Sequence, residues 1–200
     1  MFPPSARTKF VRSLTKADLE NLPAADQIPK DNVYALFRYA NATTRNIVQA
    51  AKYDSCRYGA QIMGHLLHDH LLTICAKNRI ITDTIMLVPI PLSKKRKRQR
   101  GFNQCRRIIK YICQQDNENN FQLMKALEKP EATQPQASLS QSQRRENLRG
   151  SFTLADDLSV TNKNVIIIDD VTTTGATFAE ACSTLKKDNP ENVYAVAFSH

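Results

Sequence analysis

The residues best suited to chemistry lie in one segment, Val165 to Thr177. Four aliphatic residues come first, Asp169 and Asp170 follow, and a hydroxyl-rich turn with a single glycine, Gly175, leads into an expected helix. Two adjacent carboxylates can bind neutral hydroxyls or a divalent cation. A turn of small residues at a helix start can hold a phosphate through its backbone N–H groups. A sugar phosphate would satisfy both halves of this segment.

A second candidate for chemistry is a dense basic stretch. The formal net charge of the chain is +9, and this stretch contributes 6 positive charges. Its members are Lys94, Lys95, Arg96, Lys97, Arg98 and Arg100. Such a run suits an anionic partner, either nucleic acid or a phosphorylated small molecule, but a solvated loop or helix face has the same composition. The first five of these residues form a candidate nucleic-acid patch.

Cysteine and histidine indicate no metal site. The 5 Cys are odd in number, widely spaced and contain no C-x-x-C pair, which excludes a disulfide framework and a zinc ribbon. His65, His68 and His70 are close in sequence but have no supporting ligand pattern, so we interpret them as a helix surface. The glycine motifs of P-loops and of dinucleotide-binding folds are also absent.

The apolar pattern predicts the elements that position the acidic pair and the basic stretch. Continuous apolar runs at 84–90, 165–168 and 193–198 are typical of buried parallel strands, and segments with helical spacing separate them. This alternation predicts an α/β protein whose parallel sheet is covered by helices on both faces. Ligands of such sheets bind at the carboxyl ends of the strands, so the turns after Ile90 and Ile168 are the candidate binding sites.

Other segments give weaker signals. Thr15 and Asp18 have the spacing of a helix capping box, and residues 34–39 fit a short strand or a hairpin arm. A helix is expected to open at Gly101 and Phe102.

The composition is that of a globular protein. A chain of 200 residues with 42% hydrophobic and 24% charged residues can form one domain with its own core. No apolar run approaches the length of a membrane span, and the N-terminus has no signal-peptide pattern. We therefore expect a cytoplasmic protein.

Four segments together resemble the type I phosphoribosyltransferases and, more narrowly, the competence-associated ComF family. Residues 165–177 resemble the motif that binds phosphoribosyl pyrophosphate (PRPP), and Ala50 to Tyr53 resembles an early Lys-Tyr segment. Residues 88–104 resemble a Val-Pro-x-Pro-Leu … Arg-Gly-[FY]-Asn-Gln stretch. The fourth segment consists of Thr133, Gln136, Leu139, Arg144 or Arg145, Asn147 and 150–152. The likeness extends from about residue 33 to the C-terminus.

This resemblance implies a role for each matching residue. Asp169 and Asp170 would hydrogen-bond the ribose 2- and 3-hydroxyls, with one of them assisting as a base. The 5-phosphate would be held by Thr172, Thr173, Thr174, Gly175, Ala176 and Thr177. The pyrophosphate side would consist of Pro89, Arg100, Arg144 and Arg145, the last two on a mobile loop near 128–150. Mg²⁺ would arrive with PRPP, without a direct protein ligand.

The implied function is Mg²⁺-dependent transfer of phosphoribosyl to an unidentified acceptor, with release of pyrophosphate. The alternative is a non-catalytic adaptor that senses PRPP and binds single-stranded DNA or proteins of competence and recombination. Residues 33–200 would form the phosphoribosyltransferase-like domain and residues 1–32 an N-terminal extension or partial hood. Residues 1–32 contain no Cys, so we expect neither the N-terminal zinc module common in this family nor bound zinc. A homodimer is left open.

Overall fold

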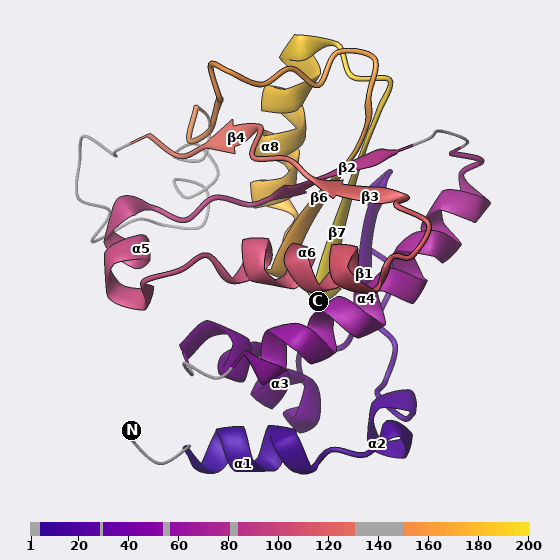
Figure 1. The fold of residues 1–200 in the computed structure, drawn as a ribbon, viewed down its shortest axis with the longest axis vertical. Helices are drawn as coiled ribbons and strands as arrows, with labels where there is room; N and C mark the ends of the chain where they lie inside the picture. Colours follow the sequence, from indigo (N-terminus) through magenta and orange to yellow (C-terminus); the bar gives the residue numbers. More distant parts are fainter. Residues whose placement is uncertain (1–4, 29, 54–56, 81–83, 131–149) are drawn as a thin grey trace.

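A computed structural model describes residues 5–28, 30–53, 57–80, 84–130 and 150–200 of the chain (Figure 1). The helices are α1 (Ala6–Ser13), α2 (Lys16–Glu20), α3 (Ala42–Tyr53), α4 (Tyr58–Lys77), α5 (Lys94–Arg100), α6 (Gln104–Gln115), α8 (Ala176–Leu185) and the 3-10 helix η1 (Lys186–Asp188). The strands are β1 (Val33–Phe37), β2 (Ile85–Pro89), β3 (Phe121–Leu123), β4 (Leu127–Glu128), β5 (Thr153–Leu154), β6 (Asn164–Val171) and β7 (Asn192–Ser199).

The central sheet has five strands in the order β1-β7-β6-β2-β3, and every pairing is parallel. Ile167 of β6 pairs with Val88 of β2 on one side and with Ala195 of β7 on the other. Because β6 is bonded on both edges and covered on both faces, its sequence is a continuous aliphatic run and does not alternate with polar residues. The predicted parallel α/β sheet is confirmed.

Helices cover the two faces of the sheet unequally. On one face, α3, α4 and α6 contribute Ile47, Leu67 and Ile108 to a core that includes Ile166. On the other face, α8 packs with the small antiparallel pair β4–β5, and Phe178 belongs to the second core there. Figure 1 shows α8 on the opposite side of the sheet from α3 and α4. Alternate residues of β6 therefore supply both cores.

The structure decides between the two alternatives for residues 34–39 and differs from the sequence-based expectation elsewhere. Residues 33–37 form a short strand, as one alternative predicted, at the edge of the sheet and parallel to β7, and the alternative of a hairpin arm is wrong. A short strand, β3, adds to the other side of the sheet and was not predicted. The basic stretch, for which the composition left a solvated loop and a helix face open, forms the helix α5, whose first turn is capped by the Ser93 hydroxyl.

Helix α6, which follows α5, also begins later than expected. It starts at Gln104, after Asn103, whose side chain accepts a hydrogen bond from the Arg106 N–H at 3.1 Å. Gly101 instead ends α5 in the left-handed conformation, with φ 75°. Gly101 therefore ends α5 and Asn103 caps the start of α6, where the sequence indicated only the start of one helix.

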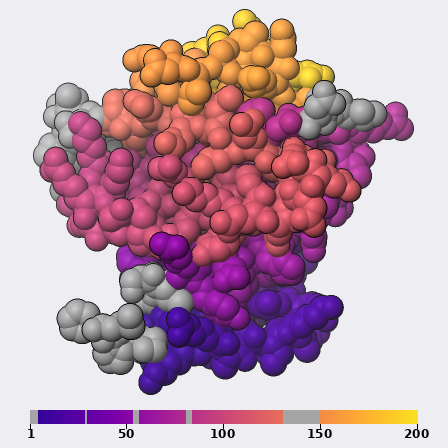
Figure 2. Space-filling model, in the orientation of Figure 1, coloured from indigo at the N-terminus to yellow at the C-terminus, as the bar shows by residue number. Residues whose placement is uncertain are grey.

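The N-terminal segment packs against the helical face of the molecule. The capping box of Thr15 and Asp18 is confirmed at the start of α2. Helix α1 was not predicted, yet its Val11 is 1% exposed and belongs to the same core as Ile47. Figure 2 shows this segment (indigo) at one end of the molecule, next to the purple surface of α3 and α4. None of the helices in the described ranges is long and apolar enough to cross a membrane.

Candidate active site

Strand β6 carries the acidic pair to the carboxyl edge of the sheet, where Asp170 turns inward. One of its carboxylate oxygens lies 2.9 Å from the Nζ of Lys52, and the other accepts a 2.7 Å hydrogen bond from Gln104 Nε2. The Asp170 side chain is 5% exposed and that of Lys52 16%. Both oxygens of Asp170 are thus bound within the protein.

A chain of contacts extends from Asp170 to the surface. The carbonyl oxygen of the Gln104 side chain accepts a 3.0 Å hydrogen bond from Arg100 Nη1, and Arg100 Nη2 donates to the Tyr53 hydroxyl at 3.4 Å. The Arg100 guanidinium also lies 4.9 Å from the centre of the Tyr53 ring. The Lys-Tyr segment at the end of α3 and the Arg-x-x-x-Gln segment between α5 and α6 therefore meet at one carboxylate.

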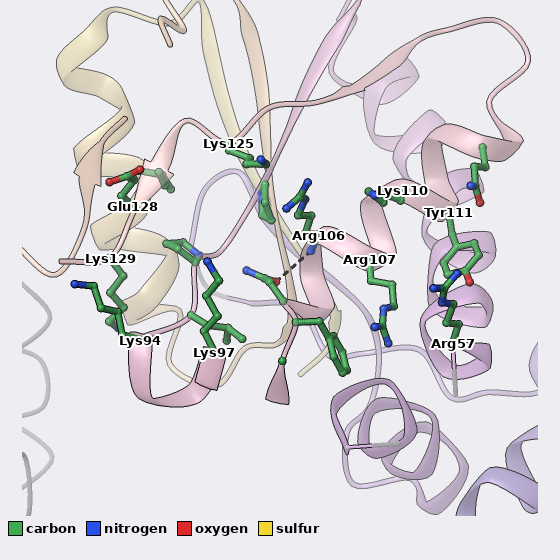
Figure 3. A pocket seen from close by; sticks show the side chains of 18 residues that line it. Arg57, Lys94, Lys97, Arg106, Arg107, Lys110, Tyr111, Lys125, Glu128 and Lys129 are labelled. Atoms are coloured by element: carbon green, nitrogen blue, oxygen red, sulfur yellow. Dashed lines mark hydrogen bonds between the residues drawn. The ribbon is translucent and has the colours of Figure 1, made fainter. Parts of the chain in front are cut away.

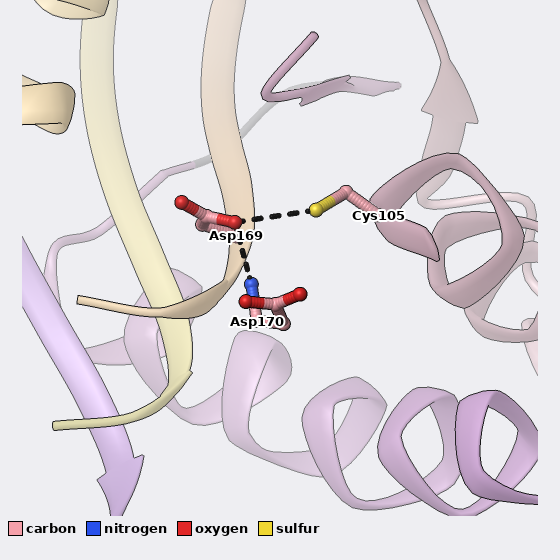
Figure 4. Close-up of side chains that lie close together, drawn as sticks. All are labelled: Cys105, Asp169 and Asp170. Atoms are coloured by element: carbon pink, nitrogen blue, oxygen red, sulfur yellow. Dashed lines mark hydrogen bonds between the residues drawn. The ribbon is translucent and has the colours of Figure 1, made fainter. Parts of the chain in front are cut away.

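Asp169 is in a different state from its neighbour. Its Oδ1 accepts hydrogen bonds from the Cys105 thiol at 3.3 Å and from the Asp170 N–H at 2.8 Å (Figure 4). Burial, and then the negative charge of Asp170, raise the pKa of Asp169 to about 7. Burial also raises the pKa of Cys105, which stays a protonated donor. Near neutral pH, Asp169 can therefore either hold or release a proton.

The donor set tests whether Mg²⁺ could bind directly to the protein here. Cys105, Asp169 and Asp170 form the one group of potential metal ligands among the described residues. Mg²⁺ requires oxygen ligands in octahedral geometry, which a protonated thiol does not supply. Because Lys52 and Gln104 bind the two carboxylate oxygens of Asp170, only Asp169 has a carboxylate oxygen to offer a metal ion. The residues fit a Mg²⁺ ion that is coordinated mainly by a bound phosphate ligand, with Asp169 as the one protein carboxylate beside it.

The turn after β6 has the form of a phosphate cradle. Thr172 is buried, and its N–H donates to the Ser199 carbonyl at 2.9 Å, whereas Thr173 and Thr174 are exposed. Gly175 adopts the left-handed conformation with φ 67° and directly precedes α8, where its own position provides no capping side chain. The N–H of Ala176, the first residue of α8, donates to the Thr174 hydroxyl at 3.4 Å, so the start of α8 and the two exposed hydroxyls lie in the same turn.

Lys30 is a residue at this turn that the sequence did not single out. A Cβ atom at Gly175 would lie 3.1 Å from the Cδ and 3.2 Å from the Nζ of Lys30. The segment before β1 therefore places a cation beside the N-terminus of α8, where positive charge is unfavourable unless an anion is present. Sequence spacing gives no signal for this contact, since the two residues lie far apart in the chain.

A basic hollow lies beside the acidic pair, on the outer side of α6. The cavity of about 770 Å³ begins at the turn after β2, where Pro89, Pro91 and Leu92 line it. Its charged lining is Arg57, Lys94, Lys97, Arg106, Arg107, Lys110, Lys125 and Lys129, with the carboxylate of Glu128. Figure 3 shows Lys94, Lys97 and Lys129 at one end and Arg57, Arg107 and Lys110 at the other. We call these the near and far ends of the basic hollow.

The predicted site residues are only partly gathered in one place. Asp169 and the turn from Thr172 to Thr177 follow one another at the end of β6, and Pro89 borders the basic hollow. In the candidate nucleic-acid patch, Lys94 and Lys97 line the hollow, whereas Lys95, Arg96 and Arg98 are exposed and are not among its lining residues. Arg100 belongs to the network around Asp170. Arg144 and Arg145, like most of the predicted mobile loop, lie outside the described residues.

Comparison with known sequences supports this assignment of elements. The model of the phosphoribosyl transferase domain family matches residues 106–199, which include β6, the turn after it and α8. "DNA utilization protein YhgH" of Escherichia coli is 35% identical over 112 residues, which are 54% of this chain and 45% of that protein. "Competence protein F" of Haemophilus influenzae is 31% identical over 111 residues, 54% of this chain and 46% of that protein. The matched segment thus spans less than half of each relative.

Solved structures that align with part of this chain include two phosphoribosyltransferases. The hypoxanthine-guanine phosphoribosyl transferase of L. donovani superposes with a TM-score of 0.44 at 10% identity, over 70% of this chain and 67% of that one. A hypoxanthine phosphoribosyltransferase from Staphylococcus aureus gives 0.39 at 16% identity, over 75% and 69%.

Proposed function

Because the chain is a phosphoribosyltransferase-like protein of the ComF family with the type I phosphoribosyltransferase fold, we propose that it binds PRPP with Mg²⁺ and transfers the phosphoribosyl group to an acceptor. One observation carries the proposal. Near the end of β6, Asp169, a carboxyl group with a raised pKa, lies close in sequence to the turn that leads into α8, and a basic hollow opens at the end of the neighbouring strand β2.

Each part of PRPP has a matching group in the chain. The turn from Thr172 to Thr177 would hold the 5-phosphate at the start of α8, with Lys30 adding a positive charge. Asp169 would accept hydrogen bonds from the ribose hydroxyls. The near end of the basic hollow would take the pyrophosphate. Asp170, bound by Lys52 and Gln104, would hold β6 and α6 in their relative positions and would not contact the sugar itself.

The same groups suit the charge changes of the reaction. As pyrophosphate leaves, positive charge develops on the ribose ring and negative charge on the leaving group. Asp169 would lie on the side of the ring, and Lys94, Lys97 and Lys129 would lie on the side of the leaving group. Mg²⁺ bound with PRPP would neutralise part of the pyrophosphate charge. Asp169 could also take a proton from the acceptor, because its pKa lies near neutrality.

Calorimetric titration with Mg²⁺ and PRPP tests the binding step. We expect heat of binding with the wild-type chain and at least a tenfold weaker affinity for Asp169→Asn, a loss of about 1.4 kcal/mol. The matched control is Asp157→Asn, which removes an exposed carboxylate and should leave the affinity unchanged. Absence of heat with the folded wild-type chain would refute the proposal. An acceptor screen that follows pyrophosphate release then tests transfer.

Binding of single-stranded nucleic acid is the second candidate function, and the far end of the basic hollow favours it. Positive charge there extends along α6 to Arg57, beyond the turn expected to meet one pyrophosphate. Phe102 and Tyr111 line the same hollow and offer aromatic rings. Cations with interleaved rings suit the backbone and bases of a single strand. The printed names of the relatives, DNA utilization and competence, agree with this candidate.

A salt titration tests the second candidate. The affinity for a fluorescent oligothymidylate should fall steeply as the salt concentration rises, because Lys and Arg side chains that bind phosphates displace counterions from the strand. Arg57→Ala with Arg107→Ala should weaken binding, whereas Lys187→Ala, on the exposed η1 segment, should not. Binding that is absent, or that does not depend on salt, would exclude this function. Competence or recombination partners, a homodimer and a cytoplasmic location stay predictions.

A further inference from the structure

The basic hollow is one continuous cavity that serves two proposed ligands. Its near end is bounded by the turn after β2, the place expected for pyrophosphate, and its far end by Arg57 at the start of α4. A single carboxylate, Glu128, stands against eight Lys and Arg side chains in the described lining. The excess charge is shared between the ends and is not divided into two separate sites.

The far end is built to hold an anion. Arg107 stacks on the ring of Phe102 at 3.5 Å, and its Nη1 atom is buried without a hydrogen-bond partner in the described part of the chain. Burial and the nearby positive charge of Arg57 lower the pKa of Arg107. A buried guanidinium N–H next to a second cation gains both a hydrogen bond and a counter-charge from a phosphate.

The near end is coupled to the acidic pair through Lys129. This ammonium lies 5.1 Å from the centre of the Phe152 ring and is partly buried. Burial and the charge of Arg96 lower the pKa of Lys129, while the charge of Asp169 opposes them. Lys129 therefore lies within electrostatic reach of both α5 and Asp169, and it lines the hollow as well.

We propose that PRPP and a single strand of nucleic acid compete for the near end of the basic hollow, so that each ligand weakens the binding of the other. This rests on both functions proposed above. A strand that occupies the whole hollow, from Arg57 to the near end, brings a phosphate among Lys94, Lys97 and Lys129. Bound pyrophosphate neutralises those lysines and repels that phosphate. The coupling must be reciprocal, because it is a free energy shared by two binding equilibria.

Anisotropy of a labelled oligothymidylate with the full chain measures this coupling. At constant ionic strength, saturating Mg²⁺ and PRPP should raise the Kd of the oligonucleotide by about tenfold, within the usual range of coupling energies. Ribose 5-phosphate is the matched ligand. It can occupy the turn at Gly175 but has no pyrophosphate, so it should leave the Kd unchanged.

Variants separate the two ends of the hollow. Arg107→Ala should weaken binding of the oligonucleotide and leave the calorimetric affinity for PRPP unchanged. Lys129→Ala should weaken both ligands and reduce the antagonism, and Lys187→Ala should alter neither.

Each outcome of these titrations identifies which proposal fails. If PRPP binds and the oligonucleotide Kd is unchanged or lower, the competition is refuted while the proposed PRPP function stands. If the oligonucleotide does not bind, the second candidate function and the competition both fail. If PRPP gives no heat, the primary function fails and the competition fails with it.

Discussion

Asp169 and Asp170 are neighbours in sequence but differ in electrostatic state. Asp170 contacts the Nζ of Lys52 at 2.9 Å, whereas Asp169 has no such ion pair among the described residues, accepts hydrogen bonds at its Oδ1 from a thiol and an N–H donor, and has a pKa of about 7. Like charges placed side by side in a buried site separate their titrations, and the carboxyl group with the weaker cation contact keeps its proton. The pair therefore combines a fixed anchor with a group that can exchange a proton.

Replacing Asp169 by Asn should stabilise the protein above neutral pH. The pKa of Asp169 is about 7 when folded, against about 3.9 for an unfolded chain, so the native state binds the extra proton between these values. Native stability therefore falls as pH rises from about 4 to 7. Asn cannot ionise and escapes this loss. We expect a higher Tm for the variant at pH 8 and little difference at pH 4, measured by calorimetry.

Asp157→Asn, at an exposed carboxylate, is the control for that comparison. A Tm difference that is the same at pH 4 and pH 8 would contradict the raised pKa of Asp169.

Replacing Lys52 should lower the free energy of unfolding much more than replacing an exposed lysine. In Lys52→Met the Asp170 carboxylate, 5% exposed, keeps the Gln104 hydrogen bond but loses its counter-charge. Leaving one partner of a buried pair unpaired costs roughly 3–5 kcal/mol in the free energy of unfolding, to be measured by urea denaturation. Adding Asp170→Asn should restore part of the loss in a double-mutant cycle. Additive effects of the two changes would show that the pair is not coupled.

The acidic pair and the turn at Gly175 could be predicted from sequence because their order along the chain is itself the signal. The partners of Asp170 could not. Lys52 and Gln104 are far from it in sequence, and only the packing of α3 and α6 on the sheet brings them to one carboxylate. The same holds for Lys30 at Gly175.

At the scale of elements, α5 is the least favourable helix for its sequence. Six of its seven residues are cations, and like charges four residues apart, such as Lys94 with Arg98, repel one another. Cations in its first turn also oppose the helix dipole. The Ser93 cap and the left-handed Gly101 hold its ends, so an anion in the basic hollow should stabilise the whole helix.

Amide hydrogen exchange should detect this effect. We expect exchange over residues 93–101 to slow on addition of inorganic pyrophosphate at constant ionic strength. Exchange over α6, Gln104–Gln115, whose buried face already fixes it, should not change. Equal slowing in both helices would indicate general stabilisation, and no slowing in α5 would exclude binding of pyrophosphate beside it. Mass spectrometry of matched peptides provides the measurement.

The elements that the sequence predicted well are those whose pattern is fully determined by burial. Strands β2, β6 and β7 are buried on both faces and are long enough to show continuous apolar runs. Strand β3 has three residues at the edge of the sheet, too few for a period, and it forms because β2 offers a free edge. Helix α5 has no apolar face at all, so charge alone could not distinguish it from a loop.

For the whole molecule, the cations behind the net charge of +9 are not spread evenly, since eight Lys and Arg side chains line the basic hollow. The basic hollow brings together cations from the start of α4, from α5, from α6 and from the segment after β3. Helix α4 and strand β2 separate Arg57 from α5 in the sequence, and α6 and β3 separate α5 from the last of these segments. Composition could predict an anionic partner, but only the fold shows that cations from several segments line the same cavity.

The N-terminal helix should unfold together with the sheet, and Val11 provides the test. Val11 is 1% exposed and shares a core with Ile47 and Leu67, since α1 contacts both α3 and α4. Val11→Ala should lower the free energy of unfolding by roughly 2 kcal/mol and shift a single calorimetric transition by several degrees. Phe10→Ala, at the adjacent exposed ring, should have little effect. Two transitions, with only the earlier one sensitive to Val11→Ala, would instead make residues 1–32 an independent unit. A single transition would mean that the cation at Lys30 is held beside the phosphate cradle by the same cooperative fold that holds Asp169.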